Sequence, residues 1–249
     1  MTMKIRGIAH RGDPKKYPEN TLSGFQSALE YGYSFVELDV QLSKDGVPII
    51  MHDYTVDRMT DHKGKVKDFT LAELKRMKIG EQETIPTLEE AMLLMRGKTN
   101  VMVELKQAGH LYPGLEEKTL EVLRKTDTFE QALVISFDLF SLQKVRRLDP
   151  DVRISPTSSN SLPSIFPWLK EYRCEMIGVP MKMLTPEYAD LIREHHLTIG
   201  PWPVDSVEEM NVIAQQYPDA LITTNDLALW AQFYEEHPEV KRVVQGWHT

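Results

Sequence analysis

The sequence predicts an α/β protein: a closed (β/α)8 barrel, or TIM barrel, with a small insertion after the second strand. Strand-like apolar segments alternate with segments of helical periodicity along most of the chain, and this order builds parallel sheets. Eight such strands remain when one hairpin is counted as an insertion. The length of 249 residues fits as well, because a barrel of this class has about 250 residues.

The second strand, at 35–40, has an unusual pattern. Side chains alternate along a strand, so Glu37 and Asp39 share one face and three aliphatic residues share the other. Adjacent carboxylates repel unless a cation or a basic group lies between them. An acidic inner face suits the carboxyl end of a barrel strand, where the outer face packs on helices. The segment 100–105 repeats this pattern with Glu104, so three carboxylates are predicted to converge.

The first strand and helix precede this element. Residues 5–10 are predicted to form a short strand, which ends in a loop at Arg11-Gly12-Asp13-Pro14. Asn20 is the expected N-cap of a helix that starts at Thr21 and ends at Gly32. Glu19 can be a capping residue only, or it can also orient a residue of the site. The order strand, helix, strand predicts a parallel pair.

The next strand-like segment, at 47–52, follows an Asp-Gly turn signal without a helical crossover. It should therefore fold back antiparallel to the second strand and bring His52 and Asp53 to about the level of Asp39. We count it as the start of an insertion at about 43–86 within one barrel domain that spans 1–249.

The rest of the chain alternates regularly. Thr70 and Glu73 have the spacing of a capping box, and Thr87 starts a second capped helix. The helices and strands predicted after the strand at 100–105 are, in order, helix 115–125, strand 132–136, helix 139–148, strand 152–155, helix 163–172, strand 175–179, helix 186–195, strand 197–200, helix 206–216, strand 220–223 and a helix from Asp226.

Composition restricts the partners. A net charge of −8 argues against a broad surface for nucleic acid or anionic membranes, so we expect a small-molecule ligand and no nucleic acid. No apolar run approaches the roughly 18 residues of a membrane span, and we expect no stable membrane insertion. Cys174 is the only cysteine and the amino terminus has no apolar segment, so we expect a cytoplasmic protein. No pattern indicates an oligomeric state.

Polar residues at the predicted carboxyl ends of the strands define a candidate site. They are His10, Arg11, Glu37, Asp39, His52, Glu104 and Lys106. The three carboxylates form an all-oxygen set that suits Mg²⁺ or Ca²⁺ better than zinc. Two histidines can act as acid and base near neutral pH, and Arg11 with Lys106 can hold an anionic oxygen. The set predicts metal-assisted phosphoryl chemistry.

At these residues the chain resembles the glycerophosphodiester phosphodiesterase family. The motifs that carry the resemblance are His10-Arg11-Gly12, Pro18-Glu19-Asn20-Thr21, Glu37-Leu38-Asp39-Val40, Lys44-Asp45-Gly46-Val47-Pro48, His52-Asp53, Pro86-Thr87-Leu88-Glu89-Glu90 and Glu104-Leu105-Lys106. They span most of the first half of the chain. The resemblance implies a barrel with an insertion after strand two, a divalent metal, and hydrolysis of a glycerophosphodiester to glycerol 3-phosphate and an alcohol.

The resemblance also implies roles for single residues. The catalytic histidines of the family map to His10 and His52. Its metal carboxylates map to Glu37, Asp39 and Glu104, and its phosphate-binding cations map to Arg11 and Lys106. Trp202 is expected to form a wall of the substrate pocket.

The second half of the chain departs from the family pattern at two motifs. Where the family often has Trp-Thr-Val-Asn and Thr-Asp, this chain has Trp202-Pro203-Val204-Asp205 and Thr224-Asn225. The departures leave the predicted metal set intact and bear on substrate preference. Two alternative functions stay open: a related barrel phospholipase, sphingomyelinase D-like or phosphoinositide-specific, and a non-catalytic barrel that binds phosphodiesters.

Overall fold

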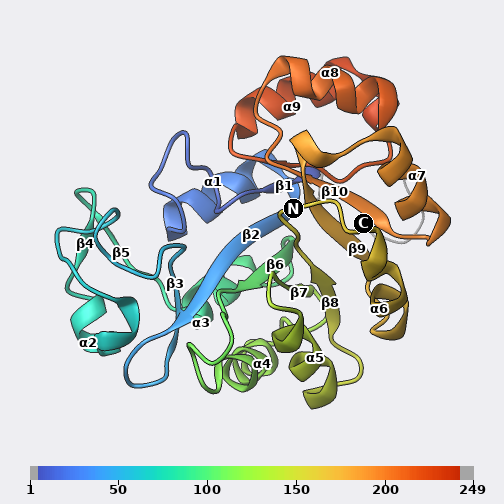
Figure 1. Ribbon diagram of the computed structural model, residues 1–249. Helices are drawn as coiled ribbons and strands as arrows, with labels where there is room; N and C mark the ends of the chain where they lie inside the picture. The colour runs from blue at the N-terminus through green and yellow to red at the C-terminus, as the bar shows by residue number, and fades with distance from the viewer. Residues whose placement is uncertain (1–4, 242–249) are drawn as a thin grey trace.

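The computed structural model describes residues 5–241, so the ends of the predicted domain, 1–4 and 242–249, lie outside the described residues. It confirms the α/β barrel (Figure 1). The eight barrel strands run parallel and are β1 (Ile5–Ala9), β2 (Tyr33–Leu42), β6 (Asn100–Leu105), β7 (Ala132–Ser136), β8 (Arg153–Pro156), β9 (Met176–Pro180), β10 (Thr198–Trp202) and β11 (Thr223–Thr224).

Hydrogen bonds between neighbouring strands close the barrel. Six strands form a continuous ladder in the order β11, β1, β2, β6, β7 and β8, and β9 pairs with β10. Ser158 donates its backbone N–H to the carbonyl of Gly178 at 2.9 Å, which joins β8 to β9. Leu221, two residues before β11, donates its backbone N–H to the carbonyl of Ile199 in β10 at 2.9 Å, and this bond joins the last two strands. The last strand is shorter than predicted, because the paired segment of β11 begins only at Thr223.

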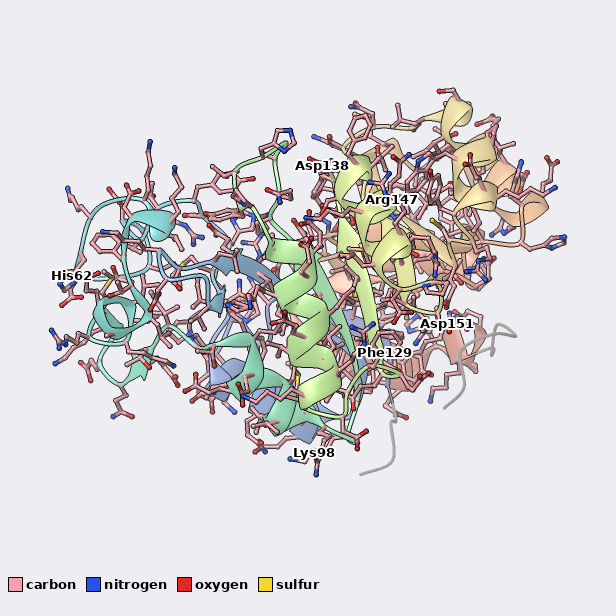
Figure 2. All side chains as sticks on the ribbon, turned by 90° about the horizontal axis from the view of Figure 1, so that it is seen from below. His62, Lys98, Phe129, Asp138, Arg147 and Asp151 are labelled. Atoms are coloured by element: carbon pink, nitrogen blue, oxygen red, sulfur yellow. The ribbon has the colours of Figure 1, made fainter. Side chains whose placement is uncertain are left out.

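A helix follows each barrel strand, although the insertion separates β2 from its helix. The helices are α1 (Leu22–Tyr31), α3 (Leu88–Met95), α4 (Leu115–Lys125), α5 (Leu139–Leu148), α6 (Phe166–Glu171), α7 (Pro186–Glu194), α8 (Val207–Gln216) and α9 (Leu227–Glu236). Figure 2 shows Lys98, just before β6, and Asp138, just after β7, at opposite ends of the barrel. The carboxyl ends of the strands therefore share the end at which Asp138 lies.

The barrel has two separate apolar layers. Val36, Leu38 and Val40 point outward from β2 into the core that the helices cover, as the alternation predicts. Each such fully buried aliphatic side chain stabilises the fold by about 1.5–3 kcal/mol. Side chains of the opposite faces fill the barrel interior: Ile8, Phe35, Met102, Leu133, Ile135, Met176 and Leu221. This inner layer lies below the polar residues and forms the floor on which the site is built.

The insertion projects from one side of the barrel (Figure 1). It begins with β3 (Pro48–Ile50), which pairs antiparallel with β2 as the Asp-Gly turn predicts. The short elements that follow are η1 (Val66–Asp68), α2 (Leu71–Leu74), β4 (Lys78–Ile79) and β5 (Glu83–Thr84). Its own small core is formed by Ile49, Met51, Val56, Val66, Leu74, Met77, Ile79 and Ile85. The insertion is thus a packed unit that can hold its side chains firmly against the barrel.

Within residues 5–241, no helix is both long enough and apolar enough to cross a membrane. His62 lies at the outer edge of the insertion in Figure 2, and it is exposed.

Candidate active site

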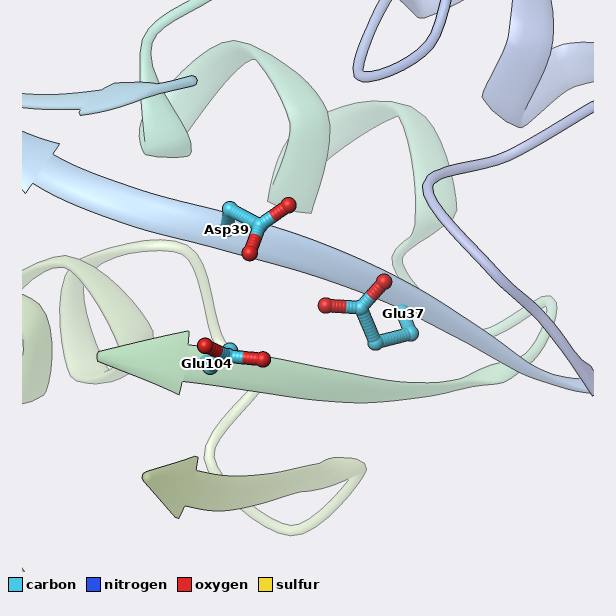
Figure 3. A group of neighbouring side chains, drawn as sticks. All are labelled: Glu37, Asp39 and Glu104. Carbon is cyan, nitrogen blue, oxygen red and sulfur yellow. The ribbon is translucent and has the colours of Figure 1, made fainter. Parts of the chain in front are cut away.

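The register of β2 and β6 brings the three carboxylates together. Asp39 lies directly opposite Glu104 in the parallel ladder, and Glu37 lies two residues earlier on the same face of β2. Each residue offers an oxygen atom, and these oxygens lie within 4.8 Å of one another. Figure 3 shows the three side chains pointing toward a common space from the two strands. The predicted convergence is confirmed in its geometry.

Burial disfavours the ionised form of the carboxyl groups in this cluster. Burial, together with the charges of Asp39 and Glu104, raises the pKa of Glu37. Burial and Asp39 raise the pKa of Glu104 to about 7. Burial alone would also raise the pKa of Asp39, but Lys106 and Arg11 hold it below its usual value. Without a cation, burial therefore opposes the ionisation of Glu37 and Glu104, whereas the neighbouring cations favour the ionised form of Asp39.

The free oxygens of the cluster fit a hard divalent cation. Within the described part of the chain, Oε1 of Glu37 and Oδ1 of Asp39 are buried and accept no hydrogen bond, although Nζ of Lys106 lies 3.3 Å from the oxygen of Asp39. Buried carboxylate oxygens that accept no hydrogen bond are costly, and a divalent cation with oxygen ligands would remove this cost. Among the described residues, Glu37, Asp39 and Glu104 would hold this ion.

Arg11 lies in the loop after β1 and contacts two acidic residues. Its Nε lies 3.3 Å from Oδ2 of Asp39, and its Nη1 donates to Oε1 of Glu19 at 3.1 Å. Its backbone N–H donates to Oε2 of Glu37 at 3.0 Å. Gly12 follows with φ of +85°, and a Cβ there would lie 2.8 Å from the backbone of Gly24. Only glycine fits this sharp turn, which holds Arg11 over the carboxylates.

Asn20 has a different role from the one predicted. Thr21, not Asn20, caps α1, by accepting from the N–H of Gly24. Asn20 adopts φ of +59° and turns inward, where its Nδ2 donates to Oδ2 of Asp39 at 2.8 Å. Asn tolerates this left-handed conformation better than most residues. It thereby anchors Asp39, whose side chain is only 1% exposed.

The insertion hairpin places His52 beside the site. The N–H of Met51 donates to the carbonyl of Asp39 at 3.0 Å, so the hairpin returns to the level of Asp39 as predicted. Buried Gln41 then donates to the carbonyls of Met51 and Asp53 at 2.6 and 2.8 Å, which fixes the backbone on both sides of His52. Nδ1 of His52 lies 2.8 Å from Oδ1 of Asp53.

Arg58 links the insertion to the loop after β1. It donates to both carboxylate oxygens of Asp53, at 2.7 and 3.0 Å, and to both oxygens of Glu19, at 3.2 and 2.6 Å. Glu19 in turn holds Arg11, and Asp53 holds His52. One guanidinium therefore orients the groups behind two predicted site residues.

His10 follows β1 and contacts a different pair of residues. Its Nδ1 lies 2.8 Å from Oδ1 of Asn225, and its Nε2 lies 3.9 Å from Oε2 of Glu37. Burial, with a contribution from Arg11, lowers the pKa of His10, so the ring is neutral near neutral pH. Lys106 lies across the cluster, with its Nζ 2.7 Å from Oε1 of Glu104 and 3.3 Å from Oδ1 of Asp39.

A cavity of about 180 Å³ opens beside these groups. Seven of the eight predicted site residues line it: His10, Arg11, Glu37, His52, Glu104, Lys106 and Trp202. Trp202 forms one wall together with Phe137, whose ring is perpendicular to it with the centroids 5.7 Å apart. The cavity thus combines carboxylates, histidines and cations on one side with an aromatic wall.

Comparison with known proteins matches the chain to one family. The model of the glycerophosphoryl diester phosphodiesterase family matches residues 10–226. The chain belongs to the glycerophosphodiester phosphodiesterase family. A glycerophosphodiester phosphodiesterase of Caldanaerobacter subterraneus is 38% identical over 231 residues, which cover 89% of this chain and 94% of the relative. One from Bacillus subtilis is 31% identical over 233 residues, covering 84% and 79%.

Two solved structures have the same fold as this chain. An Oleispira antarctica phosphodiesterase in complex with the product sn-glycerol 3-phosphate superposes with a TM-score of 0.86 at 27% identity, covering 92% of this chain and 96% of its own. A glycerophosphodiester phosphodiesterase of Thermotoga maritima, with a TM-score of 0.77 at 24% identity, covers 93% of this chain and shares the barrel.

The structure brings further residues to the site that the sequence does not indicate as site residues. The sequence predicts Asn20 as a helix cap, and it places Asp53 in the motif of His52 without indicating a role for it. Arg58 lies in a polar stretch without periodicity, so nothing in the sequence indicates which distant carboxylates it meets. In the sequence Asp205 and Asn225 stand out only as departures from the family pattern, whereas in the structure Asn225 contacts His10 and Asp205 contacts Asn225.

Proposed function

We propose that this chain hydrolyses glycerophosphodiesters to glycerol 3-phosphate and an alcohol, in a reaction that depends on a divalent cation, Mg²⁺ or Ca²⁺. One observation carries the proposal: Glu37, Asp39 and Glu104 converge beside the cavity that His10 and His52 also line. The family relationship and the product complex of the Oleispira antarctica relative support the same substrate class.

The cation would be held by Glu37, Asp39 and Glu104. When bound, it would offset the negative charge of the phosphodiester and of the transition state. Arg11 and Lys106 add positive charge at the same cavity and would bind phosphate oxygens. Both stay charged, because nearby carboxylates raise the pKa of each above its ordinary value even though burial alone would lower it. Trp202 would pack against the substrate as an apolar wall.

His10 and His52 would exchange the protons. They come from β1 and from the insertion hairpin, so they can approach a phosphorus atom from different sides, as in-line displacement requires. One histidine would remove the proton of the attacking hydroxyl, which is that of water or of the substrate glycerol. The other would protonate the departing alcohol oxygen as its bond to phosphorus breaks. If the glycerol hydroxyl attacks, the product of this step is a cyclic phosphodiester, which water must then open to give glycerol 3-phosphate.

A comparison of leaving groups tests these roles. His10→Ala and His52→Ala should each be nearly inactive on glycerophosphocholine. A nitrophenyl glycerophosphate needs little protonation of its leaving group, so the variant that lacks the acid should be substantially rescued on it and the variant that lacks the base should not. Release of glycerol 3-phosphate is measured for the wild type and both variants. Near-wild-type turnover of glycerophosphocholine by both variants would remove the histidines from the mechanism.

A further inference from the structure

Asp205 and Asn225 form a hydrogen-bonded pair beside His10. Asp205 follows β10, and Asn225 directly follows β11. The carboxylate of Asp205 accepts from the backbone N–H of Asn225 and from its Nδ2, each at 2.7 Å, and from the hydroxyl of Thr224 at 3.1 Å. The other end of the Asn225 amide meets Nδ1 of His10 at 2.8 Å. The three side chains therefore form one chain of hydrogen bonds.

The chemistry of the pair fixes the direction of each bond. An ionised carboxylate only accepts, so the NH₂ group of Asn225 must face Asp205. The amide oxygen must then face His10. Because a carbonyl oxygen only accepts, Nδ1 of His10 must carry the hydrogen of this bond.

The consequence for a neutral ring is a single tautomer. With its one proton on Nδ1, His10 carries its lone pair on Nε2, the nitrogen that lies 3.9 Å from Glu37. We propose that Asp205 and Asn225 are positioning residues, which fix the tautomer and the orientation of His10 so that Nε2 exchanges the proton with the reacting groups. This inference rests on the proposed catalytic role of His10.

The two departures from the family pattern thereby compensate each other. The family motifs compared above would place Asn at position 205 and Asp at position 225. With the residues exchanged, an Asn amide at 205 would donate to an Asp carboxylate at 225, and that carboxylate would accept from Nδ1 of His10. In both arrangements, an acceptor oxygen of residue 225 faces Nδ1 of His10. The pair therefore acts on the histidine in either arrangement.

Each single substitution should disturb the acceptor that faces Nδ1 of His10, whereas the exchange of both residues should preserve it. In Asp205→Asn the carboxylate no longer dictates the orientation of Asn225, whose NH₂ group can turn to His10 and favour the tautomer protonated at Nε2. In Asn225→Asp two carboxylates face each other and repel. We expect each to lower kcat on glycerophosphocholine by at least about tenfold with little change in KM. The double variant Asp205→Asn/Asn225→Asp should recover most of this loss.

Nitrogen NMR gives a readout that does not depend on turnover. In protein labelled with ¹⁵N-histidine, the His10 signals are assigned by their loss in His10→Ala. We expect a protonated Nδ1 in the wild type and the double variant, and a shift toward a protonated Nε2 in Asp205→Asn. Asn211→Asp, at an exposed position of α8, makes the same charge change as Asn225→Asp and should leave turnover and tautomer unchanged.

The two readouts separate this inference from the proposed function. Full activity of His10→Ala would remove His10 from the proposed mechanism, whereas the tautomer measurement would still show what the pair does to the ring. If Asp205→Asn keeps both the wild-type turnover and a protonated Nδ1, the pair does not position His10. If the double variant is as impaired as the worse single variant, the compensation is wrong.

Discussion

The affinity of the site for Mg²⁺ should rise steeply with pH. Carboxylates bind metals in the deprotonated form, so each proton that the cluster retains must leave when the ion binds. Burial and the neighbouring Asp39 raise the pKa of Glu104 to about 7. Burial, Asp39 and Glu104 also raise the pKa of Glu37. The pH range in which binding weakens therefore begins near neutrality rather than near the usual range of a carboxyl group.

The size of the effect follows from linkage. A single group with a pKa of about 7 makes the apparent Kd about tenfold weaker at about pH 6 than at about pH 8, because it is mostly protonated at the lower pH and mostly ionised at the higher. A second proton, on Glu37, makes the dependence steeper. Asp39 adds little in this range, because Lys106 and Arg11 counteract burial and hold its pKa low.

Isothermal titration calorimetry measures both consequences. Mg²⁺ is titrated at several pH values, in buffers with different heats of ionisation, which reveals the number of protons released. Glu104→Gln should bind more weakly at high pH but with a flatter dependence on pH. Glu121→Gln, at an exposed position of α4, is the matched control and should behave as the wild type. An affinity that is independent of pH, with no proton release, would refute this account of the cluster.

Two further predictions concern cations of the site. Arg11→Lys keeps the charge but cannot reach Asp39 and Glu19 with separate nitrogens, so kcat/KM on glycerophosphocholine should fall by roughly 10- to 100-fold, and unchanged kinetics would exclude Arg11 from phosphate binding. Arg58→Met should lower kcat by about tenfold, because Asp53 and Glu19 lose the guanidinium that they share. The control Arg124→Met removes an ion pair of a similarly exposed arginine on α4 and should leave kcat unchanged. Equal kinetics of the two Met variants would contradict the linking role of Arg58.

The sequence was most informative where one short segment determines the structure. The alternation around Glu37 and Asp39 fixes which side chains point inward, and the Asp-Gly turn at 45–46 fixes the hairpin that returns His52. Parallel pairing then places Glu104 beside Asp39, because carboxyl ends of parallel strands meet at one end of the barrel. Side-chain alternation, turn signals and strand order can all be recognised in the sequence, so these features can be predicted without knowledge of how the loops pack.

The parts that the sequence did not predict depend on contacts between distant loops. Asn20 looks like a helix cap in sequence, since the residues that cap helices are also those that tolerate a left-handed turn. Arg58 lies 39 positions along the chain from its partner Glu19, and no periodicity in the sequence predicts that contact. The pair of Asp205 and Asn225 shows its meaning only when β10 and β11 bring it to His10.

Chelation and restoration of the metal test the central claim most directly. Release of glycerol 3-phosphate from glycerophosphocholine is followed before chelation, after extensive chelation, and after addition of Mg²⁺ or Ca²⁺. We expect chelation to abolish the activity and one of these ions to restore it, whereas Asp39→Ala should stay folded by circular dichroism but remain inactive with either ion. Full turnover by the extensively chelated wild type would contradict the account, because the three converging carboxylates would then have no metal to hold.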